Sequence, residues 1–317
     1  MKAAIVTKTG ETPAFSDFQD PIPQAGEQLV HVRAAAISQL ARARASGTHY
    51  SFEGIYPFIA GVDGVGQLQD GRRVYFAFPK APYGAMAQQV AMSPEKLAPV
   101  PDDLDDITAA AIVNPGMSSW MALRERAAFQ PGETVLINGA TGSAGQLAVQ
   151  ITRHMGAKRI IATGRNPQAL SRLKTLGADH VISLTDDDVP AQFAEVFEAG
   201  IDIVLDYLWG SSAEQILNAA AQTSHPADPT RFVQIGSVSN GSIALPAAAI
   251  RSSAITLMGS GIGSVAPDRM VASIKELLAS AGSAGFQIAT TTAPLSDIAT
   301  AWQANTGTDR MVITVDG

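Results

Sequence analysis

Three glycines, each separated from the next by two residues, follow a short apolar run near the middle of the chain. The apolar run is Val135–Ile137, and the glycines are Gly139, Gly142 and Gly145. Apolar residues then recur at helical spacing. A strand, a glycine turn and a helix N-terminus in this order form a phosphate site, because free backbone N–H groups and the positive end of the helix dipole converge there. The residues that we predict to line this site are Thr141, Gly142, Ser143, Ala144 and Gly145.

The next expected strand, Lys158–Thr163, indicates which dinucleotide would bind. Sites for NAD usually place an acidic residue about 20 positions beyond the glycines to bind the ribose 2′-hydroxyl. Here no acidic residue occurs from Ala157 to Ala178, and Arg165 stands 20 positions after Gly145. A guanidinium pairs with a 2′-phosphate that a carboxylate would repel. The sequence therefore predicts NADPH, with a solvated strand-end arginine as the alternative. The predicted contacts here are Thr163, Gly164, Arg165 and Asn166.

Length and composition exclude several classes of protein. A chain of 317 residues with 46% hydrophobic and 16% charged residues predicts two well-packed globular domains. The net charge of −7 argues against nucleic acid as a partner. No apolar run reaches the length of a membrane span, and the first residues are too polar for a signal peptide. The absence of cysteine excludes disulfides and thiolate metal ligands and favours a cytoplasmic location.

The order of predicted elements gives the fold class. Residues 1–110 contain short β-like pieces separated by Gly and Pro, and predict a barrel-like β domain. From about residue 107, strands alternate with helices, which predicts an α/β fold with a doubly wound parallel sheet. One of these strands ends at Gly236 and Ser237, whose backbone we expect to face the nicotinamide. The last segment, 294–315, is expected to return to the first domain.

Six colinear segments resemble the zinc-independent medium-chain dehydrogenases/reductases of the quinone oxidoreductase type. They are Met1–Val6, Pro57–Gly66, Gly71–Val74, Tyr83–Ala87, Asn114–Ser118 (similar to the family's loop into the cofactor domain) and Gly177–Ile182. The resemblance implies a GroES-like catalytic domain split around a Rossmann domain, NADPH dependence and often a homodimer. The implied domains are residues 1–112 and 263–317 for the catalytic part and residues 113–262 for the cofactor part.

The resemblance also suggests site residues, with two departures from the family. Tyr50 lies one residue from the position of a catalytic Tyr in related enoyl-thioester reductases, with packing in the cleft as the alternative. Ser118 is placed to contact the nicotinamide ribose or diphosphate, or to cap a loop. The family's usual Asn and Asp are replaced by Ser38 and Ala41. The substrate of the family therefore cannot be assigned to this chain from the resemblance. No metal site is predicted, because no cysteine is present and the five histidines lack ligand spacing.

These observations predict an NADPH-dependent oxidoreductase that transfers a hydride to a quinone or an α,β-unsaturated carbonyl, both small-molecule substrates. Two alternatives stay open, a non-catalytic NADPH-binding protein and an enoyl-thioester reductase. Asp63 is expected to brace a turn, and His49 is a weaker candidate for proton transfer. The apolar strand Ile255–Met258 offers an edge for a homodimer, although burial within one chain explains it equally well.

Overall fold

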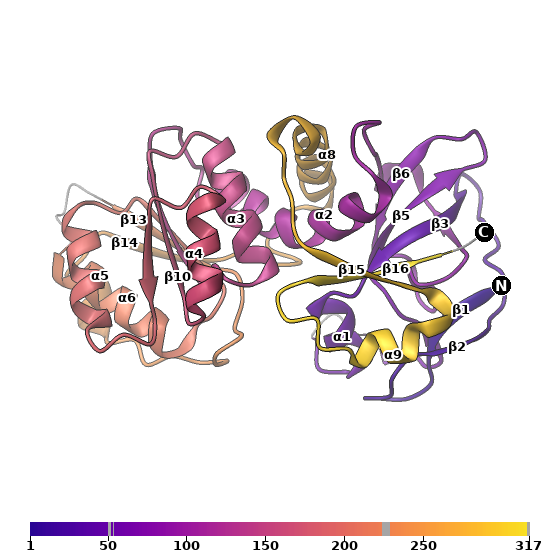
Figure 1. Cartoon of the computed structure of the whole chain (residues 1–317), viewed down its shortest axis with the longest axis horizontal. Helices are drawn as coiled ribbons and strands as arrows, with labels where there is room; N and C mark the ends of the chain where they lie inside the picture. The colour runs from indigo at the N-terminus through magenta and orange to yellow at the C-terminus, as the bar shows by residue number, and fades with distance from the viewer. Residues whose placement is uncertain (50–51, 53, 224–228, 316–317) are drawn as a thin grey trace. The chain divides into compact units, whose positions relative to one another are not determined.

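The chain folds as two units, each built around its own sheet (Figure 1). The computed structural model describes residues 1–49, 52, 54–223 and 229–315. One unit comprises residues 1–114 and 271–317, and the other comprises residues 115–270. The chain thus crosses between the units after residues 114 and 270, where the sequence predicted 112 and 262.

The unit of residues 115–270 contains a six-stranded parallel sheet, as the sequence predicted. Its strands are β9 (Thr134–Asn138), β10 (Arg159–Gly164), β11 (His180–Ser183), β12 (Ile203–Asp206), β13 (Thr230–Gln234) and β14 (Ile255–Gly259). Their order in the sheet is β11-β10-β9-β12-β13-β14. This is the Rossmann order, in which the strand sequence reverses beside β9 and leaves a crevice at the carboxyl ends of the strands.

Helices cover both faces of this sheet. They are α3 (Ser143–His154), α4 (Pro167–Thr175), α5 (Val189–Glu198), α6 (Gly210–Thr223) and the short α7 (Ala247–Arg251). On one face, Leu136 and Val204 join a core with Phe193 of α5 and Ile216 of α6. Successive strand residues alternate in direction, so the fully buried Ile137 points to the opposite face. A sheet buried on both sides explains the continuous apolar runs in its strands.

The segment Asn114–Ser118 is helical, so the prediction of a loop there was wrong. It lies inside α2 (Asp106–Met121), which has Pro115 in its interior and continues into a π-helical turn, η2 (Ala122–Arg126). A proline inside a helix removes one hydrogen bond and costs about 3 kcal/mol. Most residues of α2 from Ala109 onward are buried, and their packing offsets that cost. α8 (Pro267–Ala284) begins at the second crossing between the units.

The other unit consists mainly of antiparallel strands. The strands of its large sheet are β3 (Gln28–Ala36), β5 (Asp63–Leu68), β6 (Arg73–Ala77), β7 (Gln89–Met92), β8 (Leu97–Pro99), β15 (Thr290–Pro294) and β16 (Arg310–Thr314). A smaller sheet contains β1 (Lys2–Val6), β2 (Ala14–Asp17) and β4 (Phe58–Ile59). The last two strands of the chain complete the large sheet, because β16 pairs with β3. The helical segments of this unit include α1 (Gln39–Ala45), α9 (Ile298–Gln303) and the short turns η1 (Pro94–Lys96) and η3 (Leu295–Asp297).

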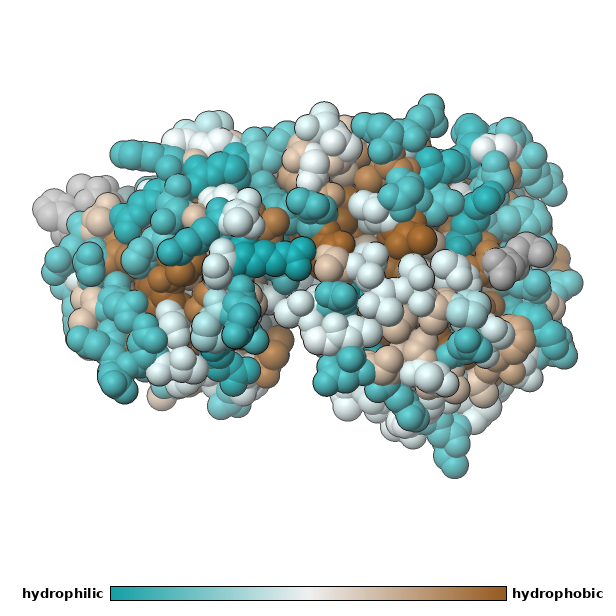
Figure 2. Space-filling view, in the orientation of Figure 1, coloured by the Kyte–Doolittle hydropathy of each residue, from teal (hydrophilic) through white to brown (hydrophobic). Residues whose placement is uncertain are grey.

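The surface is largely polar on the face that Figure 2 draws, and hydrophilic side chains cover α3 and α4 there. The inner sides of these helices carry buried residues such as Leu147 and Leu170. Among the described residues, no helix combines the length and the apolar composition that crossing a membrane requires.

Candidate functional site

The turn between β9 and α3 depends on its glycines. Gly139 has a φ of +87°, and a Cβ there would lie 2.7 Å from Cγ of Leu208. A Cβ on Gly145 would lie 2.4 Å from Cα of Ala140, so any side chain would push the helix away from the strand. Gly142 differs, because a Cβ there would meet nothing within 4 Å. The turn therefore holds the helix close to the strand and leaves the space beside Gly142 open.

The N-terminus of α3 offers donors without a side-chain cap. Gly142 is the N-cap residue, and no side chain accepts a hydrogen bond from the first turn. The first N–H groups of a helix have no partner within the helix. No acidic residue lies in the first turn, so nothing there competes with an anion for the positive end of the helix dipole. The chemistry and the open space fit a pyrophosphate.

A buried hydrogen-bond network fixes the strand ends beside this turn. Asn138 Nδ2 donates to Asp206 Oδ1 (2.7 Å) and to Ser212 Oγ (2.9 Å), and Asn138 Oδ1 accepts from the Thr163 hydroxyl (2.7 Å). Thr163 Oγ1 in turn accepts from the N–H of Gly139 (3.0 Å). One amide thereby joins the ends of β9, β10 and β12 to the start of α6. We call these residues, Asn138, Thr163, Asp206 and Ser212, the strand-end network.

The carboxyl group of Asp206 has further partners. Its oxygens accept from the backbone N–H groups of Leu208 and Trp209. Burial raises the pKa of Asp206, and the hydrogen bonds from Asn138 and the backbone oppose that shift. The sequence pattern did not single out Asn138 or Asp206, although each is a polar residue that directly ends an apolar strand. That position was the available signal, because parallel strands bring their carboxyl ends to one edge.

The residues after β10 have different surroundings. A Cβ on Gly164 would lie 2.3 Å from Cγ2 of Thr141, so this glycine lets the two segments approach closely. Asn166 caps α4, and its Oδ1 accepts from the N–H of Ala169 (2.9 Å). Arg165 is exposed and forms no hydrogen bond or ion pair with any residue that the structure describes. Its guanidinium is therefore available to a ligand.

The remaining predicted cofactor contacts lie at two other places in the same unit. Ser118 Oγ donates to the carbonyl of Pro115 (2.6 Å) and lies 3.4 Å from the hydroxyl of Tyr207, the residue after β12. Gly236 follows the end of β13 by two residues, and a Cβ there would lie 2.7 Å from the Tyr207 carbonyl oxygen. Ser237 beside it is exposed. Ser118 and Gly236 thus approach the same residue at the carboxyl edge of the sheet.

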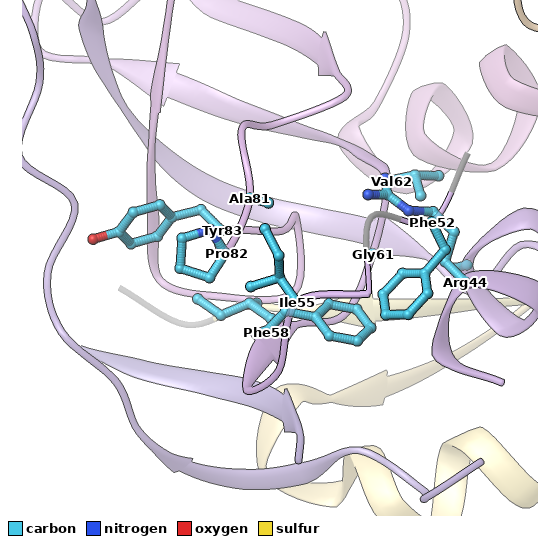
Figure 3. Close-up of a pocket in the computed structure, with 11 residues that line it drawn as sticks. Arg44, Phe52, Ile55, Phe58, Gly61, Val62, Ala81, Pro82 and Tyr83 are labelled. Carbon is cyan, nitrogen blue, oxygen red and sulfur yellow. The ribbon is translucent and has the colours of Figure 1, made fainter. Parts of the chain in front are cut away.

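The unit of residues 1–114 and 271–317 contains an apolar pocket (Figure 3). Its walls include Phe52, Phe58 and Val62, and Arg44 also lines it. Ala41, one of the two positions that depart from the family pattern, belongs to the same lining. The other departure, Ser38, is buried and caps α1, where its Oγ accepts from the N–H of Ala41 (3.0 Å). Tyr50, the predicted catalytic residue, lies outside the described residues.

A buried charged cluster surrounds Asp63. The Tyr75 hydroxyl donates to Asp63 Oδ2 (2.9 Å), and Asn114 Nδ2 donates to Oδ1 (3.0 Å). Burial raises the pKa of Asp63 to about 6, against the opposing effects of the Arg310 charge and the two hydrogen bonds. Burial lowers the pKa of Arg310, and the charge of Asp63 opposes this. Asp63 thus links β5, β6, β16 and α2 through one carboxyl group, beyond the turn bracing that the sequence suggested.

Comparisons with known proteins agree with this geometry. A family model described as zinc-binding dehydrogenase matches residues 144–280. The chain is 28% identical to a probable NADPH-dependent quinone reductase, tdiC of Emericella nidulans, over 99% of both chains. A quinone oxidoreductase from Thermus thermophilus, whose structure is also known in complex with NADPH, superposes with a TM-score of 0.84 at 26% identity and covers 99% of this chain and 100% of its own.

The chain resembles the medium-chain dehydrogenases/reductases over nearly its whole length. It is quinone oxidoreductase-like, as the sequence predicted, and it is an oxidoreductase. The chain is also 31% identical, over 71% of its length, to a phthioceranic/hydroxyphthioceranic acid synthase of Mycobacterium tuberculosis. It spans only 11% of that protein. The name of the matching family model includes zinc, but the described residues contain no group of three or more His, Cys, Asp or Glu side chains placed to hold a metal ion.

We expect Asn138→Ala to destabilise the protein strongly. The change leaves the buried carboxyl group of Asp206 and the buried hydroxyl groups of Thr163 and Ser212 short of partners, and each unsatisfied group costs about 1–3 kcal/mol. Urea denaturation should therefore show that the free energy of unfolding falls by at least about 3 kcal/mol. The matched control is Asn166→Ala, which removes an exposed helix cap and should cost about 1 kcal/mol. Equal losses in the two variants would contradict the role of the strand-end network.

Asp63 should make the stability of the reductase depend on pH. Its folded pKa of about 6 lies above the ordinary value of 3.8, so the folded state binds more protons in this window. The stabilising contribution is present below pH 3.8 and is lost as the pH rises through about 6. As the pH rises from about 5 to about 7, the free energy of unfolding of the wild type should fall by about 1 kcal/mol relative to that of Asp63→Asn.

Asp63→Asn replaces the carboxyl group with a neutral amide that does not titrate, so the free energy of unfolding of the variant should not change with pH through this group. Denaturant titrations of both proteins at several pH values measure this difference. Parallel curves for wild type and variant would show that Asp63 does not titrate in this range.

Proposed function

We propose that this chain binds NADPH in the Rossmann unit and reduces a quinone or an α,β-unsaturated carbonyl. The observation that carries the proposal is the uncapped N-terminus of α3 beside the open Gly142, together with the exposed guanidinium of Arg165, which pairs with no described residue. Two similar proteins, a probable NADPH-dependent quinone reductase and a quinone oxidoreductase studied with NADPH, support this cofactor and this class of acceptor.

Each predicted contact has a distinct task in this proposal. The backbone N–H groups of Ser143, Ala144 and Gly145, at the end of the Thr141–Gly142 turn, donate to the pyrophosphate. Arg165 pairs with the 2′-phosphate. Gly164 lets β10 approach the turn at Thr141, and Asn166 caps α4 directly after Arg165. Thr163 holds the turn through Gly139 rather than through its own ligand contact. Ser118, Gly236 and Ser237 orient the nicotinamide end.

The reaction needs positioning more than a strong base. NADPH, when bound, supplies a hydride. A quinone that gains one hydride and one proton becomes a hydroquinone, so the electrons balance with one cofactor per acceptor. The chain's own residues must exclude water and donate to the oxygen that becomes negative. Tyr50 is our proposed donor. Burial and then the positive charge of Arg44 lower the pKa of His49, so His49 is neutral at pH 7 and is a poor acid there.

Reduction of an enoyl thioester is the second candidate, because the chain matches part of the mycobacterial acid synthases at 31% identity. A non-catalytic NADPH-binding protein is the third. The cytoplasmic location stays a prediction.

Arg165→Ala should lower the preference for NADPH over NADH. Loss of a charge-assisted hydrogen bond costs about 1.5–3 kcal/mol, so the ratio of kcat/KM for the two cofactors should fall about 10- to 100-fold. Loss of nicotinamide absorbance with a quinone, an enone and an enoyl thioester gives the measurement. Arg172→Ala, an exposed arginine of α4, is the control and should keep the wild-type ratio.

The same assay separates the three candidates. Faster turnover of the thioester than of the quinone would favour the second one. Binding of NADPH without turnover of any acceptor would favour the third. A wild-type preference for NADH would contradict the role of Arg165.

We also propose a homodimer that forms through the edge of the parallel sheet. Strand β14 ends the sheet, pairs with β13 alone among the described strands and carries no charged residue. Three large apolar side chains on β14 and the segment before it are exposed: Val238 (77%), Ile250 (49%) and Leu257 (40%). An open apolar edge of this kind pairs readily with a second copy about a two-fold axis.

Leu257→Arg should therefore convert the dimer into a monomer, because two like charges would meet across the pairing edge. Sedimentation velocity would measure the change. Ile22→Arg adds the same charge at an exposed apolar position of the other unit and should leave the dimer intact. A wild-type protein that sediments as a monomer would exclude this assembly.

A further inference from the structure

Asparagine followed by glycine occurs twice in this chain, as Asn138-Gly139 and Asn240-Gly241. In such a pair the backbone nitrogen of the glycine can attack the side-chain carbonyl carbon of the asparagine, because no Cβ on the glycine hinders the approach. The attack needs a free amide side chain, a free backbone N–H and room for the backbone to turn. These three conditions separate the two pairs.

The Asn138-Gly139 pair is protected by the fold. The Asn138 side chain is fully buried, and its amide makes three hydrogen bonds within the strand-end network. The N–H of Gly139 is bonded as well, because it donates to Thr163 Oγ1 (3.0 Å). Attack at Asn138 would require these bonds to open together, so the reaction is blocked while the sheet is folded.

The Asn240-Gly241 pair meets every condition. It lies in the segment that follows β13, and both residues are exposed. Neither the Asn240 side chain nor the Gly241 N–H forms a hydrogen bond with any residue that the structure describes. The φ of Gly241 lies outside the left-handed region, and a Cβ there would meet nothing within 4 Å. The amide, the attacking nitrogen and the space around them are therefore all available.

The chain contains six asparagines, all of them among the described residues, and the other four each lack one condition. Asn114 and Asn166 precede proline, which has no N–H. Asn218 lies inside α6, where the N–H of the next residue belongs to the helical hydrogen-bond ladder. Asn305 precedes a β-branched threonine, and its Oδ1 accepts a backbone hydrogen bond (3.1 Å). Asn240 alone combines a free amide with an unhindered neighbour.

We propose that Asn240 is a site of spontaneous deamidation in the native protein and that Asn138 is not. The backbone nitrogen of Gly241 loses its proton and forms a bond to Cγ of Asn240. The bond between Cγ and Nδ2 breaks, and the side-chain nitrogen takes up a proton and leaves as ammonia. Water then opens the succinimide ring at one of its two carbonyl groups and gives aspartate or isoaspartate. The reaction needs no oxidant, reductant or cofactor, so it goes beyond the proposed function and does not depend on it.

The surroundings of Asn240 suit the new carboxylate. The Asn240 Cβ lies 3.1 Å from the position that a Cβ on Gly210 would take. Gly210 begins α6, whose first turn contains no acidic residue, so the positive end of the helix dipole favours the charged product. Because α6 follows β12, which lies inside the sheet, this place is separate from the β14 edge that we propose for the dimer.

The two products should affect the segment differently. Aspartate keeps the backbone unchanged. Isoaspartate adds one methylene group to the backbone between Asn240 and Gly241, directly after Ser239, whose N–H donates to the carbonyl of Leu208 (2.9 Å). We therefore expect isoaspartate to strain this contact and aspartate to retain it.

The test follows every asparagine of the full-length protein by mass spectrometry of its peptides, after incubation in mildly alkaline buffer. Deamidation should accumulate at Asn240 and not at Asn138. In concentrated urea both asparagines should deamidate, because only the fold protects Asn138. Methyl transfer from S-adenosylmethionine by an isoaspartyl methyltransferase then distinguishes isoaspartate from aspartate.

Gly241→Ala is the most informative variant, because a Cβ has open space and an ordinary φ there. The added methyl group should hinder the attack and slow the loss of the Asn240 amide, while thermal melts should match those of the wild type. Ser239→Ala is the matched control, since this exposed neighbour takes no part in the ring that forms, and it should keep the wild-type rate.

Two results would overturn the proposal. An Asn240 amide that survives in the native protein but is lost in urea would show that the fold protects this pair too. Equal loss at Asn138 and Asn240 in the native protein would show that burial and hydrogen bonding do not select the site.

Discussion

A buried amide, that of Asn138, is the interaction on which the cofactor unit depends. It donates twice and accepts once, and its partners come from β10, β12 and α6. Asn138, Thr163 and Asp206 are fully buried, so a shift of any strand end would leave a polar group without a partner in a medium where that is costly. The backbone N–H of Gly139 joins the network through Thr163. The glycine turn therefore starts from a fixed point, and α3 follows from it.

The other unit is organised around two buried ionisable side chains, Asp63 and Arg310, where the first is organised around an amide. Asp63 receives two hydrogen bonds and faces Arg310, two of whose nitrogens, Nε and Nη2, have no hydrogen-bond partner among the described residues. Incomplete pairing of a buried cation is destabilising, and burial accordingly displaces both pKa values toward the neutral forms. Gly61 and Val62, which precede Asp63, line the aromatic pocket. The charged cluster thus anchors the strand from which one pocket wall extends.

In the proposed function, backbone and side chains have different tasks. Backbone donors at a helix end suit a pyrophosphate, because every dinucleotide presents the same group and no side chain is needed to read it. An acceptor differs from others in shape and charge, so side chains must distinguish it. Ala41 shows the difference. The sequence showed that Ala41 departs from the family pattern, but only the structure placed its side chain in the lining of the pocket.

The sequence by itself determined the parallel sheet, the glycine turn and the lack of an acidic residue after β10, because these depend on local periodicity and on residues close together in the chain. It misjudged Asn114–Ser118, since Pro and Gly are loop signals whose cost is outweighed only by burial that local sequence does not reveal. Only the tertiary structure brought together Asn138 with Asp206, 68 residues apart, and Asp63 with Asn114, 51 residues apart. Such pairs carry no periodic signal, because their partners are set by strand order and register rather than by spacing along the chain.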